Sequence, residues 1–164
     1  MRFIHSILIF LSVLSVQAQK TSITQLEVER LTSPLGLDSK SPDFSWVIKS
    51  DDYNVNQTHY QVFVSKDKTF SNKSLVWDSG KVNSSETVYV KYQGKSLEYA
   101  TKYYWTVKVW TNKSARPKQS KISSWTTGMM GKNQWKSSWI GVNNDDKNGS
   151  KSPYFTNDFV VGNK

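Results

Sequence analysis

The segment that says most about the fold of this chain is Leu97-Glu98-Tyr99-Ala100-Thr101-Lys102-Tyr103-Tyr104-Trp105-Thr106-Val107-Lys108-Val109-Trp110. Leu97, Thr101 and Tyr103 have the spacing of a tyrosine corner. In such a corner a tyrosine hydroxyl bonds back to the chain a few residues upstream, and this fixes the entry to a central strand of a β-sandwich. We therefore expect these three residues to have a structural role.

The second half of the segment alternates with a period of two, which is the pattern of a β-strand. One face of the expected strand carries Tyr103, Trp105, Val107 and Val109. The opposite face carries Tyr104, Thr106, Lys108 and Trp110. A core needs only the first set, so the aromatic side chains of the second set call for a separate explanation.

Six further segments have the alternation and the turn-forming ends of short strands. They cover residues 23–30, 44–48, 60–64, 74–77, 86–92 and 122–127. Seven short strands spaced roughly ten residues apart, with no helix pattern, predict an all-β sandwich. Trp46 on the second strand, Tyr60 on the third and the corner residues are typical of a fibronectin type III or immunoglobulin-like sandwich, which we expect over residues 22–128.

Residues 1–18 have the pattern of a secretory signal peptide, with Arg2, an apolar run and Val16-Gln17-Ala18 as a cleavage site. The apolar run is too short to span a bilayer, which disfavours the alternative of an N-terminal membrane anchor. The chain has no cysteine, and this favours a bacterial exported protein over a disulfide-bonded eukaryotic one. We expect export to the periplasm, the cell surface or the medium, with no membrane span after cleavage.

Residues 129–164 do not continue the sandwich pattern. Residues 128–132 look like a hinge, and 154–161 look like one more strand. A single strand cannot bury its own apolar surface. The tail therefore either folds back on the sandwich or is the truncated start of a second β-sandwich, and we favour the second interpretation.

The formal net charge of +9 raises nucleic acid as a partner. However, the lysines are scattered, and Arg30 and Arg116 are the only arginines after the signal segment. Arginine is the preferred side chain for phosphate and guanine. We therefore expect no nucleic-acid partner.

No constellation in the sequence predicts a catalytic, cofactor or metal site. The close acidic pairs Glu27/Glu29, Asp51/Asp52 and Asp145/Asp146 are best explained as solvated surface charge. His59 is the one histidine after the signal segment, and there is no cysteine for a zinc site. The run from Asn144 to Gly149 is unlike a calcium loop, because Phe155 stands where a bidentate glutamate is required.

Taken together, the segments resemble a known family. The matching runs are Leu26-Glu27-Val28-Glu29, Ser33-Pro34-Leu35-Gly36-Leu37-Asp38, Pro42-Asp43-Phe44-Ser45-Trp46, Gln57-Thr58-His59-Tyr60-Gln61-Val62, Val76-Trp77-Asp78-Ser79-Gly80-Lys81-Val82, Tyr103-Tyr104-Trp105-Thr106-Val107-Lys108-Val109-Trp110, Trp125-Thr126-Thr127-Gly128, Trp139-Ile140-Gly141 and Pro153-Tyr154-Phe155. In this order they resemble the N-terminal region of bacterial α-L-rhamnosidases, which are multidomain inverting glycoside hydrolases. The resemblance implies a following second sandwich that can bind sugar and then an α/α barrel with the catalytic carboxylates. No position here matches the barrel motifs.

The outward aromatic residues are the best candidates for a binding surface. We expect Phe63 to lie on the outer face with Tyr104 and Trp110, and Trp125 to be a further candidate whose face is open. Such a patch marks an interface. Docking on the other domains of the parent enzyme is favoured, and loop-covered packing and a platform for sugar remain as alternatives.

We thus expect a non-catalytic scaffolding module of an exported α-L-rhamnosidase-like enzyme, without cofactor and without hydrolase activity of its own. Its expected partners are the remaining domains of that enzyme and a rhamnose-containing glycan. The alternative is an independent β-sandwich that binds carbohydrate or an envelope protein through the same outer face.

Overall fold

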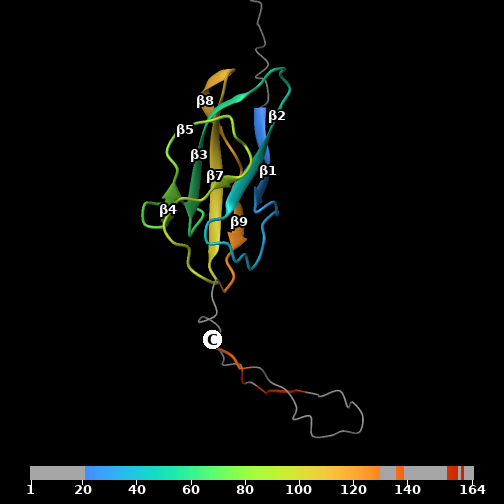
Figure 1. Ribbon diagram of the computed structural model, residues 1–164, viewed down its shortest axis with the longest axis vertical. Helices are drawn as coiled ribbons and strands as arrows, with labels where there is room; N and C mark the ends of the chain where they lie inside the picture. The colour runs from blue at the N-terminus through green and yellow to red at the C-terminus, as the bar shows by residue number, and fades with distance from the viewer. Residues whose placement is uncertain (1–20, 130–135, 139–154, 159, 161–164) are drawn as a thin grey trace, which may run out of the picture. The chain divides into compact units, whose positions relative to one another are not determined.

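The computed structural model describes residues 21–129, 136–138, 155–158 and 160, and these contain nine strands and no helix (Figure 1). The strands are β1 (Thr21–Val28), β2 (Asp43–Ser50), β3 (Gln57–Ser65), β4 (Leu75–Asp78), β5 (Val82–Asn83), β6 (Val90–Lys91), β7 (Lys102–Thr111), β8 (Ser114–Gln119) and β9 (Ser123–Thr126). The chain divides into two units, residues 1–130 and 131–164, and all nine strands belong to the first.

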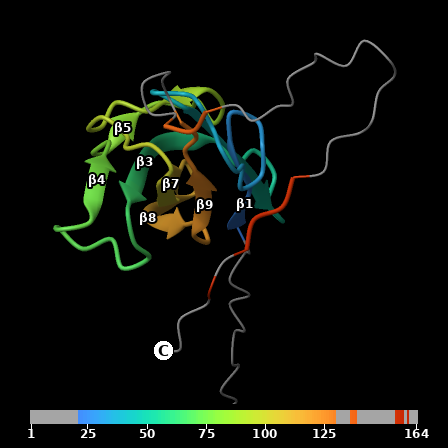
Figure 2. The same ribbon diagram turned by 90° about the horizontal axis from the view of Figure 1, so that it is seen from below.

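The strands form two sheets in which all neighbours are antiparallel. The smaller sheet has the order β1-β2-β6, and the larger has β4-β3-β7-β8, with β5 on β3 and β9 on β7. In Figure 2 the strands are seen nearly end-on, and β4, β3, β7 and β9 follow one another across the larger sheet. The prediction of an all-β sandwich is confirmed.

The core lies between the two sheets and is built by the alternating rows. Along β7 the inward residues Tyr103, Trp105, Val107 and Val109 are all buried, as the period of two predicted. Tyr60, Val62 and Val64 of β3 are buried beside them. From the smaller sheet, Phe44 packs on Trp105 with 4.7 Å between ring centroids, and Trp46 packs edge-on against Tyr60 at 5.4 Å. Such tilted contacts are the favoured geometry of aromatic pairs.

A buried glutamine connects the two sheets by hydrogen bonds across this core. The indole N–H of Trp46 on β2 donates to Gln57 Oε1 on β3 at 3.0 Å. The Gln57 amide nitrogen donates in turn to the carbonyl oxygens of Ser84 and Glu86, at 3.1 and 2.6 Å. Because an unpaired buried polar group is costly, this chain of bonds fixes how the two sheets meet.

One expected strand is much shorter than predicted. Of residues 86–92, only Val90 and Lys91 form a strand, and Val88 is 52% exposed. Tyr89 has a positive φ of 57°, which breaks the alternation between Val88 and Val90. The segment still follows β2, since the Trp46 amide donates to the Thr87 carbonyl oxygen at 2.9 Å.

Two strands are additional to the seven expected. β5 has only two residues and pairs with β3. β8 pairs with β7 and is almost entirely exposed, and its sequence Ser-Ala-Arg-Pro-Lys-Gln has no apolar alternation. Proline is tolerated in a strand at a sheet edge, and so Pro117 does not prevent this pairing.

The signal peptide predicted over residues 1–18 and the segments Trp139-Ile140-Gly141 and Pro153-Tyr154 lie outside the described residues. The boundaries 22–128 and 129–164 stay predictions. Within the described part of the chain, no helix is long and apolar enough to cross a membrane.

Candidate functional site

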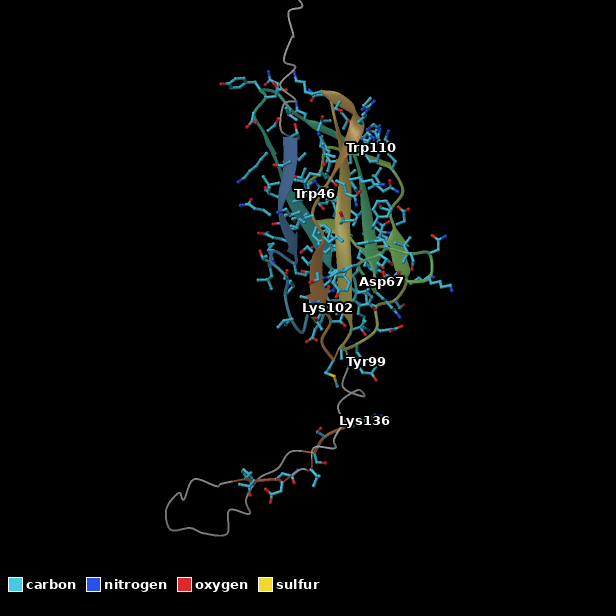
Figure 3. The ribbon with its side chains drawn as sticks, turned by 180° about the vertical axis from the view of Figure 1, so that it is seen from behind. Trp46, Asp67, Tyr99, Lys102, Trp110 and Lys136 are labelled. Atoms are coloured by element: carbon cyan, nitrogen blue, oxygen red, sulfur yellow. The ribbon has the colours of Figure 1, made fainter. Side chains whose placement is uncertain are left out.

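The outer face of the larger sheet carries three of the four predicted aromatic residues. Phe63 on β3 lies opposite Thr106 on β7, and Trp110 lies opposite His59. Phe63, Tyr104 and Trp110 are half-buried and alternate with the core rows, so they point away from the core. Figure 3 labels Trp110 toward one end of β7 and Lys102 toward the other.

Each of these three rings has a lysine ammonium over it. The contacts are Lys108 Nζ over Phe63 at 4.9 Å, Lys81 Nζ over Trp110 at 4.8 Å, and Lys68 and Lys102 Nζ over Tyr104 at 5.7 and 5.6 Å from the ring centroid. An exposed contact of this kind contributes about 0.5–1 kcal/mol. The sequence predicted the rings and placed Lys108 on the same face, but it did not predict Lys68 and Lys81 there, because these two lysines come from loops.

Within the described part of the chain, the lysines of this face form no ion pair with a carboxylate. Among the described residues the ion pairs are Lys66 with Glu98 at 2.6 Å and Lys91 with Asp43 at 2.9 Å. The nearby Asp78 carboxylate accepts hydrogen bonds from Gln61 Nε2 and from the Gly80 amide, at 2.7 and 2.8 Å. The face is therefore aromatic and cationic rather than purely apolar.

A hollow of about 460 Å³ lies beside Phe63. Phe63, Phe70, Leu75 and Ile122 supply its apolar lining, and Lys68 and Lys108 are also in its wall. The hollow thus combines a ring surface with two ammonium groups and the carboxylate of Asp78.

Trp125 was a candidate for the outer face, and this interpretation is wrong. Trp125 is 1% exposed and stacks on Tyr103 with 5.3 Å between ring centroids. The cause is the register of β9 on β7, in which Trp125 lies directly opposite Tyr103 and shares its inward face.

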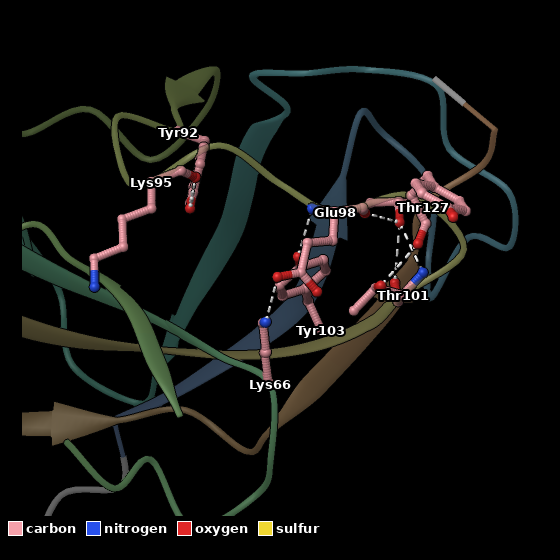
Figure 4. A network of polar contacts seen from close by, with 8 residues as sticks. Lys66, Tyr92, Lys95, Glu98, Thr101, Tyr103 and Thr127 are labelled. Carbon is pink, nitrogen blue, oxygen red and sulfur yellow. Dashed lines mark hydrogen bonds and ion pairs between the residues drawn. The ribbon is translucent and has the colours of Figure 1, made fainter. Parts of the chain in front are cut away.

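At the entry to β7, the Glu98 amide donates a hydrogen bond to the Tyr103 hydroxyl at 2.8 Å (Figure 4). Leu97 packs against the core next to it. The Thr101 hydroxyl donates to the carbonyl oxygen of Tyr99 at 2.8 Å. The three residues of the corner thus hold residues 97–103 in a closed turn.

Thr127, just after β9, ties this corner to the end of the sandwich. It is 1% exposed, and its hydroxyl donates to the Glu98 carbonyl oxygen at 2.6 Å and accepts from the Thr101 amide at 3.0 Å (Figure 4). Its own amide donates to the Thr101 carbonyl oxygen at 3.0 Å. No local pattern predicts this role, because the partners of Thr127 lie 26 and 29 residues away in the sequence.

The other side of the same segment is bonded to the loop after β1. The Thr126 amide donates to the Pro34 carbonyl oxygen at 2.9 Å, and the Gly128 amide donates to the Leu37 carbonyl oxygen at 2.8 Å. The Leu37 amide donates to the Thr126 carbonyl oxygen at 2.9 Å. We call residues 126–128, held between residues 34–37 and 98–101, the exit clamp.

Gly128 is required by this packing. A Cβ atom at Gly128 would collide with a carboxylate oxygen of Asp38 and lie 2.8 Å from the Gly36 carbonyl oxygen. The Gly128 carbonyl oxygen also accepts from the Ala100 amide at 3.1 Å. The clamp therefore fixes where the chain leaves the sandwich.

The pKa values of two ionisable groups beside the corner are raised above their usual values. The hydrogen bond to Glu98 raises the pKa of Lys66 above its usual 10.5. Burial raises the pKa of Tyr92 well above its usual 10.0, and the nearby Tyr103 hydroxyl adds to the effect. The Tyr92 hydroxyl donates to the Lys95 carbonyl oxygen at 2.6 Å, so it is held as a neutral donor.

The acidic pairs and His59 form no reactive cluster in the described residues. Glu29 accepts from the Asp43 amide at 3.1 Å, which is a structural bond. His59 Nδ1 bonds to the Thr58 hydroxyl at 3.1 Å, and its ring meets Trp110 edge-on at 6.5 Å. Residues 21–129, 136–138, 155–158 and 160 contain no group of three potential metal ligands. Asp145 and Asp146 lie outside the described residues.

Residues 23–131 match the family model described as the Rha78A-like, N-terminal immunoglobulin domain. An alpha-L-rhamnosidase of Formosa agariphila is 37% identical over 119 residues, and one of Streptomyces avermitilis is 40% identical over 120 residues. These alignments cover 71% and 73% of the chain but 12% of each relative.

Among solved structures, the alpha-L-rhamnosidase of Streptomyces avermitilis complexed with L-rhamnose aligns with a TM-score of 0.71 and 38% identity. The alignment covers 76% of this chain and 12% of that one. In both comparisons the chain corresponds to the N-terminal immunoglobulin domain and not to the catalytic part.

Proposed function

The chain belongs to the family of Rha78A-like N-terminal immunoglobulin domains, and we propose that it is the non-catalytic scaffolding module of an exported α-L-rhamnosidase-like glycoside hydrolase. The substrate class would be rhamnose-containing glycans, in line with the names of its relatives. The partners would be the remaining domains of the parent enzyme. Inverting hydrolysis needs two carboxyl groups about 6.5–9.5 Å apart across a sugar site, and those domains would supply them.

The observation that best supports scaffolding is the exit clamp. A flexible spacer would leave its last residues without backbone partners. Here Thr126, Thr127 and Gly128 are bonded on both sides, to the loop at residues 34–37 and to the corner at residues 98–101. A module built in this way gives the following polypeptide a fixed starting point and direction.

The outer face is not included in this proposal as a docking surface. The cores of protein interfaces are depleted of lysine, and this face has an ammonium group over each of its three rings.

Export is part of the proposal and is supported by the signal-like pattern of residues 1–18.

The test combines sequencing of the genomic DNA with an assay of hydrolase activity. The reading frame past the Lys164 codon is sequenced, and the longer product and the 164-residue chain are each assayed on 4-nitrophenyl α-L-rhamnopyranoside. We expect the longer product to release nitrophenol and invert the anomeric centre, and the 164-residue chain to release none. Hydrolysis by the 164-residue chain, or a stop codon directly after Lys164, would contradict the proposal.

A further inference from the structure

We propose that the outer face of β3 and β7 binds an anionic polysaccharide. Phe63, Tyr104 and Trp110 would stack on sugar rings, and the lysines over them would pair with sulfate or carboxylate groups. This inference goes beyond scaffolding, and only its choice of a glycan rests on the proposed function.

The rings are spaced to suit an extended polymer. Tyr104 and Trp110 are six positions apart on one strand, and a rise of about 3.4 Å per residue separates them by about 20 Å. Phe63 lies between them on the neighbouring strand, opposite Thr106. Flat, rigid rings offer contact area at low entropic cost, and a row of them follows a chain rather than a single sugar.

The lysines mark the ligand as an anion. Significant cation–π contacts occur about once per 70–80 residues, so about one or two would be expected in the described residues. The four contacts found in the described part all lie on this one face. None of these lysines forms an ion pair within that part of the chain, so their charges are available to a ligand.

The ammonium groups and the rings would act on the same ligand. Lys81 and Lys108 hold their Nζ atoms 4.8 and 4.9 Å from the centroids of Trp110 and Phe63. A sugar stacked beside such a ring would bring an attached sulfate or carboxylate within reach of the ammonium. Bonds of this kind, with both partners charged, are stronger than neutral ones.

Nucleic acid is the competing polyanion, because single strands also use stacked rings beside positive charge. The row carries lysine and no arginine, although arginine is the side chain best suited to bidentate phosphate contacts. A polysaccharide is therefore the better match, and single-stranded DNA serves as the competitor in the test.

The test is affinity electrophoresis of the 164-residue chain through gels that contain one polymer each. Dextran sulfate is compared with dextran, and carboxymethyl cellulose with hydroxyethyl cellulose, so each charged polymer has a neutral control with the same backbone. We expect retardation by at least one charged polymer and none by the neutral ones.

Variants locate the site. Trp110→Ala and the pair Lys81→Glu/Lys108→Glu should each weaken binding by about tenfold or more. The matched control is Lys40→Glu/Lys49→Glu, which makes the same charge change at exposed positions away from this face and should alter binding less than about twofold. Lys81→Gln/Lys108→Gln repeats the test without added negative charge, and thermal unfolding shows that each variant is folded.

Three results would overturn the proposal. They are no retardation by any charged polymer, equal loss of binding in the Lys40/Lys49 control, and tighter binding of an oligothymidylate than of the polysaccharides. None of these results would affect the reading-frame and activity test, so this inference and the proposed function can fail separately.

Discussion

Tyr103 and Thr127 bond to the two polar groups of the same backbone residue, Glu98. The Glu98 amide donates to the Tyr103 hydroxyl at 2.8 Å, and the Thr127 hydroxyl donates to the Glu98 carbonyl oxygen at 2.6 Å. The Glu98 side chain stays free to pair with Lys66. One backbone position thus joins the start of the central strand to the end of the sandwich.

Tyr103→Phe removes the hydroxyl and leaves the Glu98 amide without its partner. We expect the free energy of unfolding to fall by about 1 kcal/mol, measured by urea denaturation. Tyr99→Phe is the matched control, since Tyr99 is exposed, and it should leave the midpoint unchanged. An unchanged midpoint in Tyr103→Phe would count against the corner.

Thr127→Val keeps the shape of the side chain and removes the hydroxyl that bonds to Glu98 and Thr101. Because the site is buried, the free energy of unfolding should fall by about 1–3 kcal/mol. Thr127→Ser keeps the hydroxyl, and its free energy of unfolding should fall clearly less. A smaller loss of unfolding free energy in Thr127→Val than in Thr127→Ser would show that the methyl group, and not the hydroxyl network, stabilises the clamp.

Gly128→Ala places a methyl group against Asp38 and the Gly36 carbonyl oxygen. We expect the free energy of unfolding to fall by about 1–3 kcal/mol, as at other overpacked sites, measured by thermal or urea denaturation. Asp38→Ala alone is the control, and the double variant Asp38→Ala/Gly128→Ala should recover only part of the loss, because the backbone contact with Gly36 remains. A neutral Gly128→Ala would show that the clamp is loose.

Tyr92 should make the protein sensitive to alkali. Its pKa is raised by burial in the folded state, so the unfolded chain loses this proton first as pH rises above 10.0. The contribution to stability is therefore complete below about pH 10 and declines as pH rises from there toward the folded pKa. Tyr92→Phe should flatten the fall of unfolding free energy above pH 10, measured by urea titrations.

The matched control for that titration is Tyr53→Phe, since Tyr53 is 90% exposed. It should follow the unmodified protein at every pH. At neutral pH, Tyr92→Phe should also lose about 1 kcal/mol, because the bond to the Lys95 carbonyl oxygen disappears. Identical alkaline slopes in both variants would contradict the assignment to Tyr92.

The local sequence pattern was sufficient to predict the central strands and their buried faces. The alternation of residues 103–109 and 60–64 places apolar side chains every second position, and burial on one face of a sheet follows directly. The spacing of Leu97, Thr101 and Tyr103 likewise depends on residues close in the sequence.

Features that depend on distant partners were not predictable in this way. The residues two positions before and after Trp125 are Ser123 and Thr127, so no apolar alternation indicates its face. Its face is set by the register of β9 with Tyr103 on β7. The polar strand β8 forms because β7 offers it a partner, and not through its own propensity. The lysines over the outer rings come partly from loops whose positions follow only from the whole fold.

The scaffolding role requires a rigid exit clamp, and amide hydrogen exchange measures this rigidity residue by residue. We predict that the amides of Thr126, Thr127 and Gly128 exchange as slowly as that of Val107 in the centre of β7, since each is hydrogen-bonded within the sandwich. Exchange of these three amides at the rate of the exposed loop residue Tyr53 would contradict a fixed exit and with it the scaffolding role.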